Sequence, residues 1–502
     1  MQSCERKTGG GLQGTVALSL LLCCACGPHG HTPRTPPASK GASMPFSPYG
    51  TRTPTMGFFG ASNGSLTRDG QPVLVMSNGL DISPQPLALQ PSDLSQRPVW
   101  FSSDIDYLGR LVLADLDKDG ALDAIVPTLI DHALMFAGGV LKVYRGDARG
   151  LVPTPAQSVA SGGSLTCAAG DADGDGDTDV AIAMMGSAGQ LGQLPPPSAG
   201  PIKIFLNHGG VLQAEPGWSA QQQPASYVGG LSFADANQDG LMDLIASGDR
   251  LMIYYGGATP DGSRLELEPG WTSRDQWQVG YDLAWSKAGK AAPFQVVVSA
   301  TCVSGFLSCG STPDAPYRAY RPVRTDASSA ASIWTAAGRS LGGGIALRDL
   351  DGDGFPDLAA AALDMGGSPL RIYAGNAGGF ASDAAYGSAQ NMLGASVNVA
   401  AVDGSLRRVS EALQSIAGGH VLTLATPAER LLALRIAGKA VPDARVSFVP
   451  GSAVLSLAEA QPAGATIEVE YEVIAHPSLI VSDSQPPGGA VVFVNQATTA
   501  EK

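Results

Sequence analysis

Four short segments of the chain place acidic residues at alternate positions around a glycine. They share the pattern Asp-x-Asp/Asn-x-Asp-Gly-x-x-Asp and begin at Asp115, Asp171, Asp235 and Asp349. Alternate residues of a tight loop turn their side chains to one side, and glycine at position 6 permits the sharp turn. Calcium is a hard cation that takes six to eight oxygen ligands. The pattern therefore predicts a calcium ion in each loop, about four ions in the chain.

The predicted ligands are the side chains at positions 1, 3, 5 and 9 and the backbone carbonyl at position 7. In the first two loops these positions are Asp115, Asp117, Asp119, Ala121 and Asp123, then Asp171, Asp173, Asp175, Asp177 and Asp179. In the other two they are Asp235, Asn237, Asp239, Leu241 and Asp243, then Asp349, Asp351, Asp353, Phe355 and Asp357. An acidic turn that binds nothing is the alternative. The shared glycine argues against it, and so does the repulsion that clustered carboxylates suffer without a cation.

The residues around these loops do not fit an EF-hand, whose twelve-residue loop ends in a bidentate Glu between two helices. Position 12 is occupied here by residues that cannot bind a cation, namely Val126, Ile182, Ala246 and Ala360. Short apolar runs flank each loop, such as Leu111–Ala114 before the first and Ala124–Val126 after it. Such runs are typical of buried strands. We therefore expect the loops to connect strands.

Two further segments recur after each acidic loop. A third apolar strand is expected at 141–144, 202–205, 251–254 and 370–373, and Glu-Pro-Gly-Trp occurs twice, ending at Trp218 and Trp271. Four strands per unit, with about 50–65 residues between successive units, indicate a β-propeller.

The acidic loops in their strand frame resemble the FG-GAP and VCBS repeats of integrin α-subunits and bacterial surface proteins. The resemblance covers roughly residues 55–405 and 476–497. The FG and GAP signatures themselves are poorly kept. The resemblance implies an all-β propeller with calcium loops on one face.

Three degenerate units would bring the blades to seven, although six remains an alternative. One runs from Leu283 to Val298 and has Lys290 at position 5, where an ammonium group could occupy the metal cavity. A second begins near Val397, and a third spans residues 57–75 with Val73–Val75 as a strand. We expect the ring to be closed by the C-terminal strand 491–494 and an N-terminal strand around 98–101.

Residues 406–475 interrupt the last unit. Leu406, Val409, Leu413 and Ile416 predict a helix that ends at Gly418. Strands are expected afterwards at 421–424, 431–436, 446–449, 454–457 and 466–473, the last with strict alternation. This pattern indicates a small Ig-like β-sandwich inserted into the final blade. Its Glu468, Glu470 and Glu472 are either a ligand site or a solvated face.

The N-terminus has the features of an export signal. Arg6 and Lys7 precede an apolar run from Leu12 to Ala25 that is too short to span a bilayer. The sequence before Cys26 resembles the lipobox of bacterial lipoproteins, which implies lipid attachment at Cys26. Cys24 is the alternative acceptor, and an ordinary secretory signal is the alternative interpretation. Residues 1–25 are then the signal and residues 26–55 a Pro-rich tether, leaving the protein anchored to the cell envelope, at the outer membrane or cell surface.

Three cysteines follow the signal. Cys302 and Cys309 lie close together in a Gly/Ser-rich segment of an exported chain, which predicts a disulfide between them. Cys167 lies within an apolar strand, where we expect a small buried residue and no reactive thiol.

The net charge of −14 and the lack of a basic stripe exclude nucleic acid as an expected partner. Four blades with metal loops lie within residues 56–405, and residues 476–497 complete the last blade. The longest variable segments, 184–201 and 299–318, fall on the opposite end from the metal loops. The sequence therefore predicts a non-catalytic adhesion module for protein or glycan. A propeller enzyme, such as a polysaccharide lyase or hydrolase, and a scaffolding subunit of an envelope complex are the alternatives.

Overall fold

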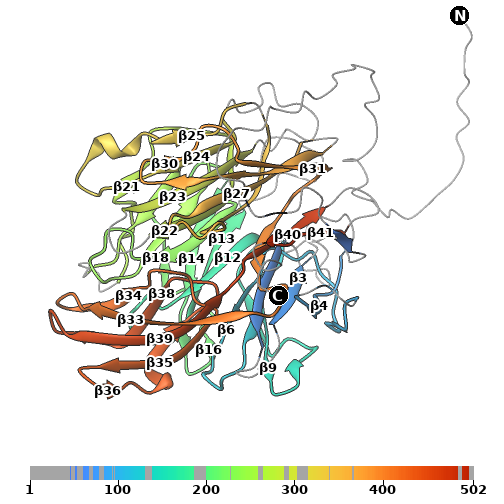
Figure 1. The fold of residues 1–502 in the computed structure, drawn as a ribbon. Helices are drawn as coiled ribbons and strands as arrows, with labels where there is room; N and C mark the ends of the chain where they lie inside the picture. The colour runs from blue at the N-terminus through green and yellow to red at the C-terminus, as the bar shows by residue number, and fades with distance from the viewer. Residues whose placement is uncertain are drawn as a thin grey trace, which may run out of the picture. The chain divides into compact units, whose positions relative to one another are not determined.

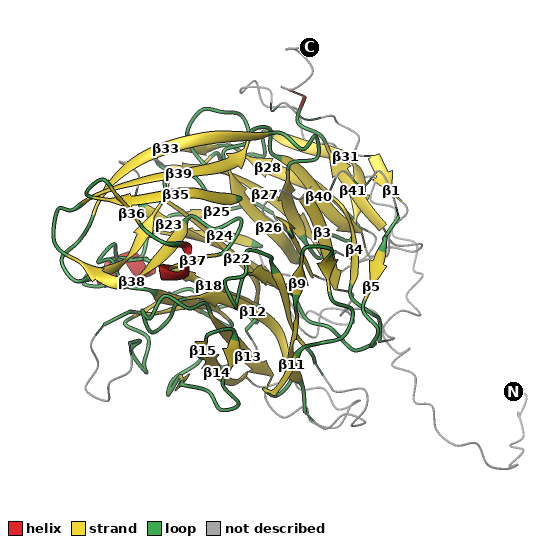
Figure 2. Ribbon diagram, turned by 90° about the horizontal axis from the view of Figure 1, so that it is seen from below, coloured by secondary structure: helices red, strands yellow, loops and turns green. Residues whose placement is uncertain are grey.

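The computed structural model describes residues 44, 46 and 51–496, apart from 54–59, 67–71, 78–83, 93, 95–96, 130–137, 186–198, 227, 258–263, 288–292, 302–314, 339, 365–366 and 484–488. The expected signal, Cys26, Lys290 and the Cys302–Cys309 pair lie outside the described residues. The expected tether 26–55 is wrong at its C-terminal end, because Met44 and Phe46 are buried in an apolar core and Thr51–Thr53 form a strand. The described chain is almost entirely β-structure, as Figures 1 and 2 show.

Seven antiparallel four-stranded sheets succeed one another along the described residues. The first contains β2 (Gly60–Ser65), β3 (Pro72–Ser77), β4 (Ala88–Pro91) and β5 (Trp100–Phe101). The second contains β6 (Val112–Ala114), β7 (Asp123–Pro127), β8 (Val140–Tyr144) and β11 (Gln157–Ala160). The third contains β12 (Ser164–Gly170), β13 (Asp179–Met185), β14 (Ala199–Phe205) and β17 (Trp218–Ser219). The fourth contains β18 (Gly230–Ala234), β19 (Asp243–Ser247), β20 (Leu251–Tyr254) and β21 (Trp271–Thr272).

The remaining three sheets keep this order of strands. The fifth contains β22 (Val279–Lys287), β23 (Phe294–Thr301), β24 (Tyr317–Tyr320) and β25 (Trp334–Thr335). The sixth contains β26 (Gly342–Arg348), β27 (Asp357–Ala362), β28 (Ser368–Tyr373) and β31 (Tyr386–Met392). The seventh contains β32 (Val397–Ala400), β40 (Ser478–Asp483), β41 (Gly489–Phe493) and β1 (Thr51–Thr53). The predicted strand frame around all four acidic loops is thus confirmed.

The first strands of the sheets contact one another in a closed cycle. β2 contacts β6, and the contacts continue through β12, β18, β22, β26 and β32 back to β2. A separate cluster of buried apolar residues fills the space between each sheet and the next. Sheets that pack face to face in a cycle are the arrangement of a β-propeller. The chain is therefore an all-β protein with propeller-like packing of small sheets.

The two ends of the described chain meet in the seventh sheet. β1 pairs antiparallel with β41, with Thr51 opposite Val492, and strands from both ends lie side by side in Figure 1 (β3 and β4 beside β40 and β41). The predicted role of residues 98–101 in closing the ring is wrong. Trp100 pairs with Leu89 as the outer strand of the first sheet, because pairing with a strand just before it in the chain costs little loop entropy.

Residues 406–475 form two further sheets between β32 and β40. One contains β33 (Leu406–Gln414), β39 (Thr466–Ile474), β35 (Arg430–Ile436) and β36 (Lys439–Ala440), and the other β34 (Gly419–Thr423), β38 (Val454–Gln461) and β37 (Val446–Phe448). The sheets share one apolar core, with Leu434, Ile467 and Tyr471 from the first and Leu422 and Leu455 from the second. We call this segment the inserted module.

The predicted helix from Leu406 to Ile416 is wrong. This segment is β33, which pairs along its whole length with β39, from Leu406 opposite Ile474 to Gln414 opposite Thr466. Val409 and Leu413 are four residues apart, and this spacing puts two residues on one face of a helix and equally on one face of a strand. The strictly alternating β39 supplies the pairing partner that decides between them. On β39 itself, Glu468 is exposed and Glu472 forms an ion pair with Arg430.

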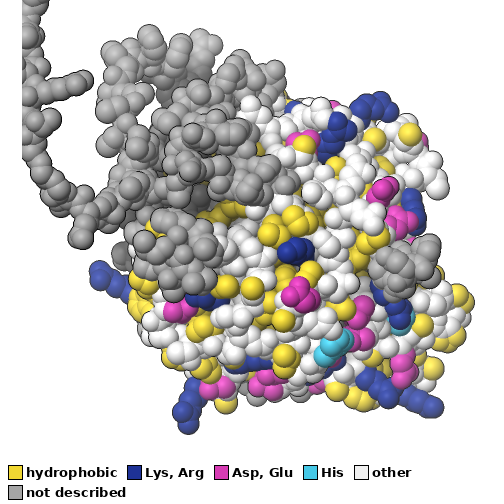
Figure 3. All heavy atoms as spheres, turned by 180° about the vertical axis from the view of Figure 1, so that it is seen from behind, with side chains coloured by type: hydrophobic (Ala, Val, Ile, Leu, Met, Phe, Trp, Pro, Cys, Tyr) yellow, Lys and Arg dark blue, Asp and Glu magenta, His cyan; other side chains and the backbone are white. Residues whose placement is uncertain are grey.

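No helix in the described part of the chain is both long and apolar enough to cross a membrane. On the face of the molecule in Figure 3, the basic side chains are dispersed among acidic and neutral ones.

Candidate metal centres and the adjoining chamber

The four acidic loops occupy the same connection in four sheets, between the first and second strands. In each loop the second carboxylate oxygen at position 1 accepts a hydrogen bond from the glycine N–H at position 6, over 3.0–3.1 Å. These four glycines have φ between 81° and 92°, a conformation that glycine adopts without strain. The glycine signal in the sequence is thus explained by the backbone.

Positions 3 and 5 complete the turn. The side-chain oxygen at position 5 accepts from the backbone N–H of position 7 over 2.8–2.9 Å in all four loops. Carboxylate oxygens converge to within 4.8 Å of one another in three trios, namely Asp115, Asp117 and Asp119; Asp171, Asp173 and Asp179; and Asp349, Asp351 and Asp353. In the remaining loop the Asn237 oxygen takes the place of the position-3 carboxylate and accepts from Asp239 N–H at 3.0 Å.

The aspartate at position 9 has a structural role that the sequence pattern did not predict. One of its oxygens accepts from the backbone N–H of position 2 over 2.7–3.1 Å. The other accepts from the backbone N–H of the second residue after the third strand, over 2.7–2.8 Å. These four side chains are at most 1% exposed. Each therefore ties its loop to the third strand of its sheet.

Burial raises the carboxyl pKa values in the loops. Burial, together with neighbouring carboxylates, raises the pKa of Asp115 to about 6 and those of Asp171 and Asp235 to about 7. Burial likewise raises the pKa of Asp357 to about 7. Such shifts mean that the fully ionised loop is costly in the absence of a positive charge. The donors are all oxygens, which fits a hard cation such as calcium.

Basic side chains already contact the first two loops. Arg145 lies 2.6 Å from Asp123 and 3.2 Å from Asp117, so a guanidinium group faces two of the expected ligands of the first loop. Lys118 lies 2.9 Å from Asp177, whose other oxygen accepts from Gly209 N–H. The side chain of Asp177 is thus engaged elsewhere, and only its carbonyl remains as the predicted ligand. No such ion pair occurs among the described residues of the third and fourth loops.

The inserted module lies against the ends of these loops. Lys118 donates to the carbonyl of Ala444 at 2.6 Å. The Gly240 carbonyl accepts from the backbone N–H groups of His420 and Val421 at 2.7 and 2.8 Å. In the second loop, the hydroxyl oxygens of Thr178 and Ser447 lie 2.6 Å apart. The end of the propeller that carries the acidic loops is therefore partly covered by the chain itself.

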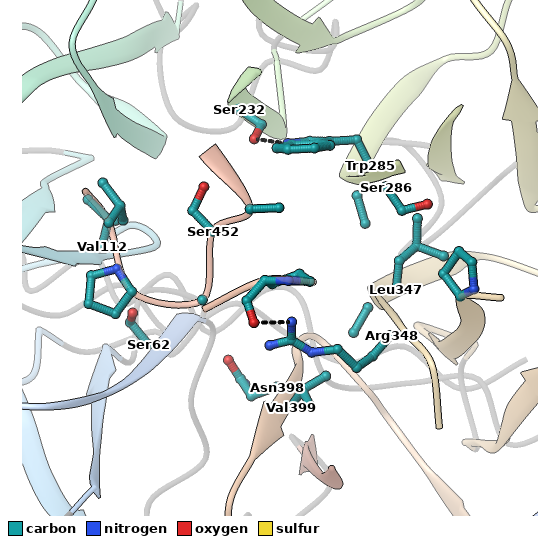
Figure 4. A pocket seen from close by; sticks show the side chains of 18 of the residues that line it. Ser62, Val112, Ser232, Trp285, Ser286, Leu347, Arg348, Asn398, Val399 and Ser452 are labelled. Carbon is teal, nitrogen blue, oxygen red and sulfur yellow. Dashed lines mark hydrogen bonds between the residues drawn. The ribbon is translucent and has the colours of Figure 1, made fainter. Parts of the chain in front are cut away.

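A chamber of about 610 Å³ lies between the sheets and the inserted module. All seven first strands contribute to its wall, and residues 425–427, Glu429 and 449–453 of the inserted module also line it. Figure 4 shows side chains from opposite strands, including Ser62, Trp285 and Arg348, around this space.

A partly buried ion pair crosses between opposite sheets near the chamber. Arg110, just before β6, contacts Asp282 of β22 at 2.8 Å and also donates to the Gly229 carbonyl. Asp282 accepts in turn from the N–H of Ile345 on β26. Leu111, Ala284 and Ala346, one or two residues further along these strands, line the chamber, so the ion pair lies close to it.

A second buried ion pair joins the wall to the inserted module. Arg348 at the end of β26 donates to the carbonyl of Pro427 and to Glu429, both at 3.2 Å, and the first of these bonds is drawn in Figure 4. Arg348 is 9% exposed, and its Nε has no hydrogen-bond partner. Nothing in the sequence pattern identified Arg348 or Glu429, because they are 81 residues apart.

The structure also contains a polar cluster around Lys142 that the sequence did not predict, and it shows the surroundings of Cys167. Lys142 on β8 contacts both Asp104 and Asp106, and the Tyr144 hydroxyl donates to Asp104, which forms a buried polar cluster at the outer side of the second sheet. Cys167 is free and buried as expected, and burial raises the pKa of its thiol to about 12.

Comparisons with known proteins add little to this picture. No known protein family matches the chain, and no curated protein sequence matches it. A crystal structure of BBS1N in complex with ARL6DN is similar over 90% of this chain and 95% of that chain, with a TM-score of 0.45 and 9% identity. A humanized mutant of the Chaetomium thermophilum Polycomb Repressive Complex 2 is similar over 63% of this chain and 67% of that chain, with a TM-score of 0.39 and 11% identity. The function is therefore inferred from the chain's own residues.

Proposed function

We propose that this protein is an exported, calcium-stabilised β-propeller of the FG-GAP/VCBS type that acts as a non-catalytic binding module for an extracellular protein or glycan. The seven four-stranded sheets are its blades, four of them carrying a calcium loop, and the inserted module is an Ig-like sandwich within the last blade. Calcium is a structural ion in this proposal, since it cancels the repulsion among the loop carboxylates and holds the strand ends together.

The observation that carries the proposal is that the inserted module contacts the metal loops. This end of the propeller is therefore partly taken by the chain itself. Connections at the opposite end join the second and third strands of the blades and include the long segments 184–201 and 299–318. Loops on a rigid scaffold commonly carry recognition. We assign partner binding to that end.

The cellular location of the protein is part of the same proposal. Acylation of Cys26 would anchor the chain to the cell envelope by lipid chains, with residues 27–43 as a tether. Replacement of Cys26 by Ala is expected to move the protein from the membrane fraction to the soluble fraction of exported proteins. Retention in the membrane fraction would remove the lipid-anchor part of the proposal.

Binding is best tested with the intact mature chain in calcium on glycan arrays and by crosslinking on cells with mass spectrometry. A partner found in this way should be lost when residues 186–198 are replaced by a Gly/Ser linker of equal length. The control is a change on the inserted module, Arg445→Ala, which removes only an exposed ion pair with Glu459. If the control loses binding and the loop variant keeps it, recognition lies at the end covered by the inserted module, and the assignment to the opposite end is wrong.

A further inference from the structure

We propose that the chamber beneath the inserted module is a binding site for a small, neutral, polyhydroxylated molecule of the size of a monosaccharide or cyclitol. This site is distinct from the loops to which the proposed function assigns partner binding.

The size of the chamber suits a small molecule. Its volume of about 610 Å³ lies within the range of roughly 300–1,000 Å³ that is usual for ligand pockets. Residues of all seven first strands and of the inserted module line it.

The lining offers hydroxyl and amide groups from many directions. They come from four different first strands and from the inserted module, namely Ser62, Ser232, Ser286, Asn398, Thr426 and Ser452. The Asn398 amide N–H₂ donates to Ser396 at 2.8 Å, which holds the side chain in place and leaves its oxygen as an acceptor. Trp285 adds an aromatic ring to the wall, and its indole N–H is held by Ser232 at 2.9 Å. A few fixed polar groups beside an aromatic surface are typical of a small-molecule site.

The charges of the lining are balanced, which favours a neutral ligand. The lining contains two cations, Lys287 and Arg348, and two carboxylates, Asp349 and Glu429. Arg348 pairs with Glu429, and the charge of Lys287 acts on Asp235. An anionic ligand would therefore have to compete with carboxylates that are already present.

Arg348 provides the independent sign of a ligand. A buried ion pair costs desolvation that its own attraction seldom exceeds, and a buried donor without a partner costs a further part of its hydration. Arg348 is nine-tenths buried, and its Nε lacks a partner. The guanidinium group points into the chamber in Figure 4. A small shift of the guanidinium group would bring that N–H, which is shielded from solvent, to a hydroxyl group of a bound molecule.

Calorimetric titration of the mature chain with D-glucose, D-galactose, N-acetylglucosamine and myo-inositol tests this proposal. At least one of these neutral probes should bind at a single saturable site. Glucuronate and inorganic phosphate serve as anionic comparisons and should bind at least tenfold more weakly. The chamber variants Ser62→Leu and Asn398→Leu should each weaken binding of the neutral probe tenfold or more, because Leu fills space and removes a polar group.

The matched control is Ser158→Leu, which makes the same change at an exposed position of β11. It should bind like the unmodified chain. If the strand variants melt early, Thr426→Leu in the inserted module replaces them. The proposal is overturned if none of the neutral probes binds, if the anions bind better, or if the chamber variants bind normally. Partner binding through the 184–201 loop would remain in each of these cases, so the two proposals fail separately.

Discussion

The aspartate at position 9 illustrates why a motif residue must be judged by its contacts. Both oxygens of Asp243 accept backbone N–H bonds, from Ala236 at one end of the loop and from Gly256 beyond the third strand. Asp351, at position 3 of the fourth loop, accepts from a single N–H, that of Asp353. One residue of the motif therefore supports the sheet, whereas the other mainly shapes the loop.

This difference predicts that Asp243→Asn destabilises the protein even without calcium. An Asn amide presents an N–H₂ group to a backbone N–H, which leaves a buried donor unpaired and costs about 1–3 kcal/mol. Asp351→Asn should alter only the calcium-dependent part of the stability. Urea unfolding in chelator and in calcium distinguishes the two variants. Equal losses in chelator would show that position 9 has no special structural role.

The Lys142 cluster predicts a pH effect at a site away from the loops. Burial raises the pKa of Asp104, but the hydrogen bonds from Lys142 and Tyr144 and the charge of Lys142 outweigh it and hold that pKa below the ordinary value of 3.8. A carboxyl group with a lowered folded-state pKa stabilises the protein above its unfolded-state pKa. That contribution is lost as the pH falls through the folded-state value.

Asp104→Asn should therefore destabilise the protein at neutral pH by about 1–2 kcal/mol, since Asp106 still neutralises Lys142. The difference between variant and unmodified chain should shrink as the pH falls below 3.8. Urea midpoints at a series of pH values measure this. A difference that stays constant down to pH 3 would contradict the assignment.

At the scale of elements, the inserted module shows how a segment is held by another part of the fold. Most of its core is its own, although Trp285 of β22 packs against it and Val421 and Val454 join the cluster between the third and fourth sheets. The buried Arg348–Glu429 pair also joins it to β26. Glu429 is largely buried, and burial raises its pKa while the charge of Arg348 lowers it. The pair thus links the module to the propeller in surroundings where an unpaired charge would be costly.

A double-mutant cycle on this pair gives a third prediction. Arg348→Met should cost about 3–5 kcal/mol, because it leaves Glu429 as an uncompensated buried charge. The double change Arg348→Met with Glu429→Leu should recover most of that loss, since two apolar side chains need no partner. The free energy of unfolding of the two singles and the double measures the coupling. A double variant as unstable as the sum of the singles would show that the two residues act independently.

At the scale of the whole molecule, the cycle of sheets is closed by strands from both ends of the chain. The pairing of β1 with β41 supplies the seventh sheet with its outer strand. Neighbouring sheets share apolar clusters around the whole cycle, so a change at one loop affects the packing of two sheets. Calcium binding at four loops should therefore stabilise the molecule as a unit.

This leads to the prediction that chelation lowers the melting temperature of the mature chain by several degrees or more. Each site stabilises the folded state by about 1.4 kcal/mol when free calcium is tenfold above its Kd. Magnesium at the same concentration should restore less of the stability, because it demands octahedral geometry and gives up water reluctantly. Differential scanning calorimetry in calcium, in magnesium and in chelator makes the comparison. Unchanged melting in chelator would remove the structural role proposed for calcium.

The sequence by itself determined the features that depend on short stretches of chain. The four loops, the strands on either side of them and the glycine turns were predictable because hydrogen bonds between residues a few positions apart shape them, as between Asp115 and Gly120. The alternation of β39 was equally visible. The segment 406–416 was not, because the spacing of Val409 and Leu413 suits a helix and a strand alike.

Only the tertiary structure decided what depends on residues far apart. Thr51–Thr53, and not residues 98–101, form the closing strand. Arg145 contacts the first loop. The tertiary structure also set the inserted module on the end that carries the acidic loops and so formed the chamber with its Arg348–Glu429 pair. Contacts of this kind arise when the sheets pack into a cycle, and no spacing along the chain encodes them.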